Sequence, residues 1–239
     1  MMENGARKNI SEVMKSQDSW WTTVLPARAA NRLVGLLSQT NVTPNQVTIA
    51  SALLGFAAAA CFATGIYGWM SAGAVVLQIS FVLDCADGQL ARVKNKCSIA
   101  GGWLDIATDI LKNFSFFFGL TWGSVRSGSP SKTWAWGFLA YFLSVATMFL
   151  YAIRPKQIPA RVSDVKNNTT NIIIDALYHW ARKHAYFLSF SVPDQLLLIS
   201  ICVILGVPRA AIMLMVFWGA PAMAFSLLRT WNRIRVYER

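Results

Sequence analysis

Residues 84–92 read D-C-A-D-G-Q-L-A-R, and residues 101–109, which follow after eight intervening residues, read G-G-W-L-D-I-A-T-D. In the first segment two acids and two small residues recur at the spacing of one helix face, namely Asp84, Asp87, Gly88 and Ala91. In the second, a glycine and two acids recur in the same way, namely Gly101, Asp105 and Asp109. The sequence therefore predicts two helices, joined by a turn at 92–98, that point four carboxylates at one place between them.

Such a cluster in an apolar setting needs compensating charge. One carboxylate near the centre of a bilayer costs roughly 2.5–3.5 kcal/mol on insertion scales, and four neighbouring carboxylates also repel one another. Mg²⁺ and Mn²⁺ prefer such hard oxygen ligands, and two ions about 3.5–4 Å apart suit four acids. The alternative is that the acids are solvated or pair with Lys94, Lys96 or Lys112. Four acids on matching faces favour a site for two metal ions.

The spacing D-x2-D-G-x2-A-R-x8-G-x3-D-x3-D resembles the signature of the CDP-alcohol phosphotransferase family. All eight signature positions are filled: Asp84, Asp87, Gly88, Ala91, Arg92, Gly101, Asp105 and Asp109. The family also carries a motif similar to T-P-N-Q-V-T at residues 43–48. The resemblance covers chiefly residues 40–160.

The resemblance implies an enzyme that moves a phosphatidyl or other phospho-alcohol group from a CDP-linked donor to an acceptor hydroxyl, with release of CMP. It implies Mg²⁺ or Mn²⁺ as cofactor, two ions in all, and a homodimer. By similarity the metal ligands are Asp84, Asp87, Asp105 and Asp109. The catalytic residues implied are Asp105 and Asp109, with Asp109 as the general base that also touches a metal.

The resemblance likewise implies a set of residues that contact the CDP group: Asp84, Asp87, Gly88, Ala91, Arg92, Gly101, Asn45 and Thr48. Small side chains at Gly88 and Ala91 leave room for the cytidine, although small residues also favour plain helix packing in membranes. Arg92 suits a donor phosphate, and an arginine that snorkels to the interface is the alternative. Helix capping alone accounts for Thr43.

Basic residues after the fourth apolar segment are candidates for the acceptor pocket. Arg154, Lys156 and Arg161 suit a phosphorylated polyol such as inositol phosphate or glycerol phosphate. The positive-inside rule explains the same residues without any ligand. Lys112 follows Asp109 by three positions, and we expect it to pair with that acid or to shift its pKa.

Composition indicates an integral membrane protein. Hydrophobic residues make up 55% of the chain and charged residues only 14%, against about 25% charged in an ordinary soluble domain. The net charge of +11 does not indicate a nucleic-acid partner, because the basic residues gather in four segments that are expected at the cytoplasmic side: the N-terminal segment, the turn at 92–96, residues 154–183 and the C-terminal tail. That rim suits anionic lipid headgroups and places the site at the cytoplasm, on the inner membrane if the source is bacterial.

Apolar segments predict an all-α polytopic membrane protein with six spans. The expected spans are 47–66, 69–90, 99–122, 133–153, 193–206 and 210–228. The fifth is long enough only if 185–192 contributes, and 123–132 is expected to be an external loop. Residues 19–40 predict an amphipathic interfacial helix anchored by Trp20 and Trp21, with a short soluble helix as the equal alternative. A second interfacial helix is expected at 171–185.

The chain divides into an N-terminal segment, 1–40, and a transmembrane catalytic domain, 41–239. The four cysteines and the two histidines, His179 and His184, show neither zinc-ligand spacing nor a disulfide pattern. The favoured function is phospholipid biosynthesis. A soluble CDP-polyol joined to a polyol phosphate is the alternative within the family. A divalent-cation transporter, in which the acids line a permeation path, is the alternative of another class, and an inactive scaffold is a third.

Overall fold

The computed structural model describes residues 26–152 and 191–237, and these ranges contain helices and no strand. The helices are α3 (Pro26–Leu37), α4 (Pro44–Ala63), α5 (Tyr67–Val93), α6 (Ile99–Arg126), α7 (Thr133–Ala152), α10 (Val192–Ile204) and α11 (Pro208–Tyr237). This confirms the predicted all-helical class.

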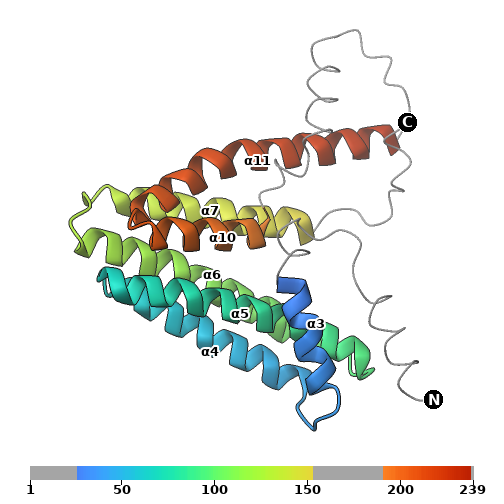
Figure 1. The fold of residues 1–239 in the computed structure, drawn as a ribbon. Helices are drawn as coiled ribbons and strands as arrows, with labels where there is room; N and C mark the ends of the chain where they lie inside the picture. Colours follow the sequence, from blue (N-terminus) through green and yellow to red (C-terminus); the bar gives the residue numbers. More distant parts are fainter. Residues whose placement is uncertain (1–25, 153–190, 238–239) are drawn as a thin grey trace.

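Six of these helices pack as a closed ring. Neighbours around the ring follow the order α5, α4, α6, α7, α11, α10 and back to α5, and their long axes run roughly side by side (Figure 1). A single core of buried apolar side chains fills the ring, with Phe62, Leu77, Leu120, Ile199 and Met215 among its largest members. Both α5 and α6 pack on α4, so α4 holds in place the two helices that carry the acidic motif.

Helix α3 lies across one end of the ring. It packs on α5 (Figure 1), where Ala30 and Val34 are buried with Val47, Ala86 and Leu90 in a second small core. The sequence predicts a helix over 19–40, and the structure gives one over Pro26–Leu37. Residues 19–25 lie outside the described ranges, so an interfacial position for this helix stays a prediction.

Local capping explains where α4 and α6 begin, and a left-handed residue marks the turn between α5 and α6. At α4, the Thr43 side chain accepts a hydrogen bond from the Gln46 backbone N–H, and the Gln46 side chain accepts one from the Thr43 N–H. At α6, Ser98 Oγ accepts a hydrogen bond from the Gly101 N–H at 3.0 Å. The turn between α5 and α6 reverses the chain through Asn95, whose φ of 53° lies in the left-handed region.

Lys94 fastens this turn to the segment before α4. Its Nζ donates to the carbonyl oxygens of Thr40 and Val42, each at 2.7 Å. The contact ties the end of α5 to the start of α4. In the alternative in which the acids pair with lysines, Lys94 was one possible partner. Here it contacts backbone carbonyl oxygens instead.

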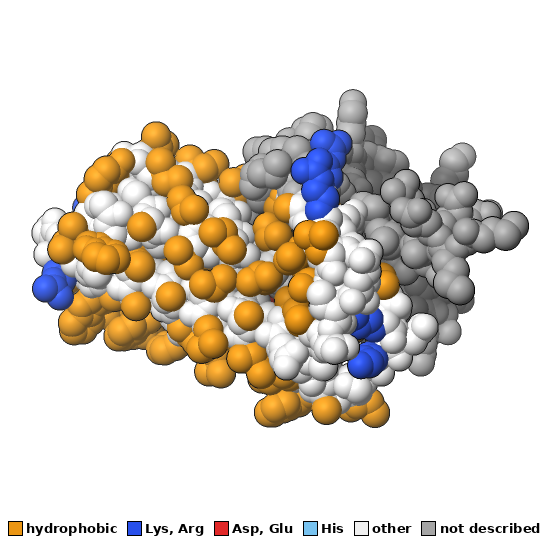
Figure 2. Space-filling model, turned by 60° about the horizontal axis from the view of Figure 1, so that its bottom comes forward, with side chains coloured by type: hydrophobic (Ala, Val, Ile, Leu, Met, Phe, Trp, Pro, Cys, Tyr) orange, Lys and Arg blue, Asp and Glu red, His pale blue; other side chains and the backbone are white. Residues whose placement is uncertain are grey.

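Within the described ranges, four helices are long and apolar enough to cross a membrane: 44–63, 67–93, 133–150 and 208–228. They agree with the first, second, fourth and sixth predicted spans. On the face drawn in Figure 2, hydrophobic side chains spread over the middle of the bundle, whereas Lys and Arg side chains stand at its two ends. This distribution is that of a multi-pass membrane protein.

The third and fifth predicted spans are not among these four helices. Helix α6 is 28 residues long but carries Asp105, Asp109 and Lys112, and it is not among the four apolar spans. Helix α10 has 13 residues, about 20 Å at 1.5 Å per residue, which is short of the roughly 30 Å hydrocarbon core. Residues 185–190, which the fifth span requires, lie outside the described ranges.

Two helices extend further than the sequence predicts. Helix α6 continues to Arg126, into the segment expected to be a loop, and the remaining connection is 127–132. Helix α11 continues through the predicted end of the sixth span to Tyr237. Polar residues mark where a span leaves the membrane and do not by themselves end a helix. The predicted helix at 171–185 lies outside the described residues, and the division at residue 40 stays a prediction.

Glycines on α6 set its distance from α4. A Cβ on Gly119 would lie 2.3 Å from the carbonyl oxygen of Ala59, and one on Gly123 would lie 1.9 Å from that of Phe62. Real Cβ atoms do not approach backbone oxygens this closely, so the two helices reach their observed packing only with glycine at these positions.

We expect Gly119→Ala or Gly123→Ala to push α6 away from α4 and to lower stability by about 1–3 kcal/mol, the usual range for overpacking. Thermal unfolding in detergent measures the effect. Gly68→Ala on α5 is the control, because nothing lies within 4 Å of its added Cβ. Unfolding of Gly119→Ala at the temperature of the control variant would contradict the proposed close contact.

Candidate metal centre

Three carboxylates converge where α5 and α6 face each other. Asp84 comes from α5, and Asp105 and Asp109 come from α6. One carboxylate oxygen from each lies within 4.8 Å of the others, and all three residues are half-buried. Oxygen donors in this arrangement are the ligand type that Mg²⁺ and Mn²⁺ select. The predicted convergence is thus present for three of the four acids, and these residues fit a divalent cation.

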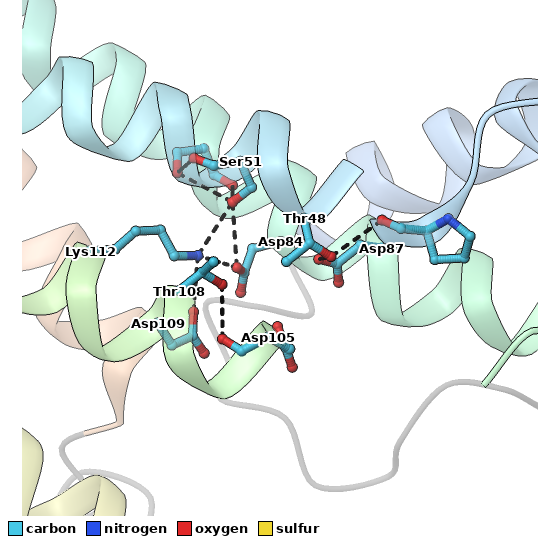
Figure 3. Close-up of polar contacts among 10 residues, drawn as sticks. Thr48, Ser51, Asp84, Asp87, Asp105, Thr108, Asp109 and Lys112 are labelled. Atoms are coloured by element: carbon cyan, nitrogen blue, oxygen red, sulfur yellow. Dashed lines mark hydrogen bonds and ion pairs between the residues drawn. The ribbon is translucent and has the colours of Figure 1, made fainter. Parts of the chain in front are cut away.

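The fourth acid, Asp87, lies beside this group on the side of α4 (Figure 3). It is buried, and its Oδ2 accepts a hydrogen bond of 2.6 Å from the Thr48 hydroxyl. The same hydroxyl lies 3.2 Å from the carbonyl oxygen of Pro44. Thr48, a predicted nucleotide contact, therefore positions Asp87 in this structure. Metal ligation by Asp87 stays a prediction.

Lys112 reaches the acids from one turn further along α6. Its Nζ contacts Asp84 Oδ1 and lies 2.9 Å from Asp109 Oδ1 (Figure 3). It also donates to Ser51 Oγ at 3.3 Å. The predicted pairing with Asp109 is confirmed. The contact with Asp84 agrees with the alternative in which Lys112 pairs with the acids, although the sequence does not indicate which acid of the first segment it meets.

Ser51 on α4 completes this polar group. Its hydroxyl lies 3.0 Å from the carbonyl oxygen of Ser80 and 3.4 Å from Asp84 Oδ1, and the residue is fully buried. The sequence analysis missed it. A signal was available, because Thr48, Ser51 and Gly55 recur at the spacing of one helix face along an otherwise apolar α4.

Gly88 leaves open space on α5. A Cβ there would meet only the Arg92 Nη1 atom, at 3.7 Å, so no neighbouring helix packs against this position in the described structure. Arg92 itself is exposed, and Ala91 is half-buried. Close packing against another described helix therefore does not explain the glycine.

Gly101 lies where the first turns of α4 and α6 approach each other. A Cβ on it would lie 3.0 Å from Ser98 Oγ and 3.2 Å from Asn45 Oδ1. The structure thus brings Asn45 beside the start of α6, the helix that carries Asp105 and Asp109. Both residues were predicted to contact the nucleotide, and this stays a prediction.

A cavity of about 240 Å³ adjoins the acids inside the ring. Asp84, Asp109 and Lys112 line one part of it, and apolar side chains such as Leu77, Phe116 and Ile199 line much of the rest. Two amides, Asn113 and Gln195, also face it. A space that is polar at the carboxylates and apolar beyond them suits a ligand with both characters.

A buried hydrogen-bond chain supports one wall of the cavity. Asn113 Nδ2 donates to Ser144 Oγ at 2.9 Å, and Ser144 Oγ donates to Gln195 Oε1 at 2.6 Å. These contacts link α6, α7 and α10 around the cavity. None of the three residues was singled out from the sequence, because their partners lie on helices far apart in the chain. Arg154, Lys156 and Arg161, the predicted acceptor residues, lie outside the described ranges.

Comparison of the sequence with known proteins agrees with this geometry. The profile of the family described as CDP-alcohol phosphatidyltransferase matches residues 41–206, which is well over half of the chain and extends beyond the segment that the motif alone covers. The archaetidylinositol phosphate synthase of Pyrococcus horikoshii is 35% identical over 94 residues, 39% of this chain and 48% of that protein. The bifunctional IPC transferase and DIPP synthase of Aquifex aeolicus is 33% identical over 108 residues, 45% of this chain and 23% of that protein.

These alignments therefore span about half or less of the curated relatives. Among solved structures, the phosphatidylinositol phosphate synthase of Mycobacterium tuberculosis with CDP-DAG bound has a TM-score of 0.62 at 17% identity, covering 85% of this chain and 94% of that one. The same enzyme in complex with manganese and citrate gives a TM-score of 0.56 over 84% of this chain and 88% of that one. These likenesses concern the fold. Together with the profile match and the intact acidic motif, they lead to one conclusion: the chain belongs to the CDP-alcohol phosphatidyltransferase family.

Proposed function

We propose that this protein transfers a phosphatidyl-type group from a CDP-linked lipid to an alcohol and releases CMP, in a reaction that requires divalent cations. The observation that carries the proposal is the convergence of Asp84, Asp105 and Asp109 within 4.8 Å at the meeting point of α5 and α6. The manganese complex of the Mycobacterium tuberculosis enzyme supports Mg²⁺ or Mn²⁺ as the cofactor.

Each acid has a proposed part in this reaction. Asp84, Asp87 and Asp105 hold the ions, and Asp109 also touches one. Two bound cations supply the positive charge that holds the donor pyrophosphate and stabilises CMP as the leaving group. Asp109 accepts the proton of the attacking hydroxyl through its carboxylate. It borders the cavity beside the acids, which is where an acceptor hydroxyl has room to approach.

The nucleotide occupies the open face of α5 in this proposal. Gly88 and Ala91 leave space for the cytidine, and the exposed guanidinium of Arg92 contacts a donor phosphate. Gly101 and Asn45 lie at the same end of the bundle. Thr48 acts through Asp87, which it holds by a hydrogen bond.

A lipid donor and a phosphorylated polyol acceptor are the favoured substrates. The apolar lining next to the acids suits the lipid part of a donor, and two of the similar proteins are named as an archaetidylinositol phosphate synthase and a phosphatidylinositol phosphate synthase. Arg154, Lys156 and Arg161 are proposed to bind the acceptor phosphate. Transfer from a soluble CDP-polyol to a polyol phosphate is the second candidate, because it uses the same acids and leaving group.

The proposed membrane arrangement has six spans and a cytoplasmic site. Helices α6 and α10 complete the ring that the four apolar spans begin, which supports six spans although α10 is short. Helix α3 lies at the end of the ring that carries the acids, as an interfacial helix would. The division into 1–40 and 41–239, a homodimer, and the inner membrane in a bacterial source complete the proposal.

Purified protein with Mn²⁺ or Mg²⁺ should release CMP from CDP-DAG only when a matching alcohol, such as inositol phosphate, is supplied. Chromatographic detection of CMP over a panel of lipid and soluble CDP-linked donors tests the reaction, and removal of the ions with EDTA should stop it. Ion flux in liposomes together with no CMP release from any donor would instead support a cation transporter.

Asp109→Asn and Asp105→Asn should separate the two proposed roles. Loss of a general base lowers the turnover rate by about 10²–10⁴-fold, so Asp109→Asn should lose rate while it still binds Mn²⁺. Asp105→Asn should weaken Mn²⁺ binding as well as rate. Equal loss of metal binding in both variants would assign Asp109 to the metal ligands alone.

Gly88→Leu should weaken CDP binding with little loss of stability, because an added Cβ there meets only the end of the Arg92 side chain, at 3.7 Å, and no other helix. Titration with CDP in the presence of Mn²⁺, beside thermal unfolding in detergent, measures both quantities. Gly68→Leu, which also enters open space but lies far along α5 from the acids, is the matched control. Unchanged CDP affinity in Gly88→Leu would place the nucleotide elsewhere.

Cys97 provides a test of orientation. It is exposed in the turn between α5 and α6, whereas Cys61 and Cys85 are half-buried and Cys202 is buried. A membrane-impermeant maleimide should label Cys97 in inside-out vesicles and spare it in right-side-out vesicles. Cys97→Ser should abolish the labelling. The opposite pattern would place the site on the other side of the membrane.

A further inference from the structure

Lys112 is a buried cation at the centre of the acidic cluster. Only 5% of the residue is exposed. Its ammonium group has three donors, and three partners surround it: Asp84 Oδ1, Asp109 Oδ1 and Ser51 Oγ. A lysine on a membrane helix usually extends to the interface, but this one is directed between two acids instead (Figure 3). The two ion pairs with those acids therefore explain why the side chain points into the bundle.

A glycine on α4 leaves space for the aliphatic part of the Lys112 side chain. A Cβ on Gly55 would lie 3.0 Å from both Cγ and Cδ of Lys112 and 3.3 Å from Ser80 Oγ. Glycine at this position lets the stem pass between α4 and α6 to reach the acids. Helix α4 thus positions the ammonium group in two ways: Gly55 contacts the stem of the lysine, and Ser51 accepts a hydrogen bond from its Nζ.

Lys112 lies between two acids of the cluster. Three carboxylates converge here, and the ammonium group forms ion pairs with Asp84 and Asp109. Neighbouring like charges that are removed from water are costly unless an opposite charge compensates them. The lysine contacts one oxygen of Asp84 and one of Asp109, so it reduces their repulsion before any ion binds.

We propose that Lys112 is the built-in counter-cation of the acidic cluster, which stabilises the metal-free protein and at the same time lowers the affinity of the cluster for divalent cations. The inference rests on the proposed metal dependence and goes beyond it. It assigns to this chain a residue that sets how tightly the ions are held.

The sign of the effect on ion binding follows from charge. An ion held by Asp84 and Asp109 would lie a few ångströms from an ammonium group that is bonded to the same carboxylates. Charges at such a distance interact strongly in a partly buried site, and the ammonium repels the ion. The lysine also uses lone pairs that an ion would otherwise share. Both effects weaken binding of the ion when no anionic substrate is present.

Binding of Mn²⁺ alone to the purified full-length protein in detergent tests this inference. In Lys112→Met, calorimetric titration should give a dissociation constant lower by roughly tenfold or more, while the metal-free protein unfolds at a lower temperature. Saturating Mn²⁺ should therefore raise the unfolding temperature of the variant more than that of the wild type. Lys112→Arg, which keeps the charge, should remain near the wild-type affinity.

Two further variants separate this effect from general damage. Lys132→Met removes an exposed ammonium group just before α7, at the far end of α6 from the acids, and it should leave Mn²⁺ affinity unchanged. Gly55→Ala crowds the lysine stem while the charge stays, and it should tighten Mn²⁺ binding by less than Lys112→Met does. Gly68→Ala serves as its control. If Lys112→Met does not fold, Gly55→Ala carries the test.

Unchanged or weaker Mn²⁺ binding in Lys112→Met would overturn the inference, because a purely structural lysine, or one that orients the ligands, gives that result. Such an outcome would leave the proposed reaction intact as long as the wild type binds Mn²⁺ and releases CMP. Absence of Mn²⁺ binding in the wild type would overturn both proposals together.

Discussion

Negative charge held between apolar helices is the constraint on which this structure depends. Asp84, Asp105 and Asp109 converge within 4.8 Å, and water screens them only partly because each is half-buried. Two kinds of contact make the arrangement tolerable in the protein itself. Lys112 supplies an opposite charge to two of the acids, and Thr48 supplies a hydrogen bond to the neighbouring Asp87. Bound divalent cations would add further compensation and would connect the cluster to its proposed chemistry.

The rest of the fold serves to hold α5 and α6 at the separation that the cluster needs. Both helices pack on α4 and not mainly on each other, which leaves space between them for the acids and the adjoining cavity. Gly119 and Gly123 bring α6 against the backbone of α4, while Lys94 ties the turn after α5 to the segment before α4. The geometry of the site is therefore fixed by contacts at both ends of the helices that carry it.

Sequence reasoning predicted those parts that depend on periodicity. The spacing of the acids located both helices and the turn between them, and apolar length located four helices that the structure shows to be long and apolar enough to span a membrane. The contact from Thr48 to Asp87, and the choice of Asp84 as the second acid that Lys112 meets, could not be predicted, since they depend on how far α4 is shifted along α5 and α6. Glycine contacts set that shift, and a single sequence does not state which backbone each glycine meets. The start of α10 was not predicted. Apolar length alone favoured a longer span, whereas the helix begins at Val192, directly after Ser191 at its N-cap.

The most direct test of the central claim is the position of bound Mn²⁺ in crystals of the protein grown with Mn²⁺ and CDP. Anomalous scattering at the manganese edge should show ions between Asp84, Asp105 and Asp109, with the pyrophosphate of CDP in contact with them. Well-ordered carboxylates with no anomalous peak between them, in crystals where CDP is bound elsewhere, would contradict the account.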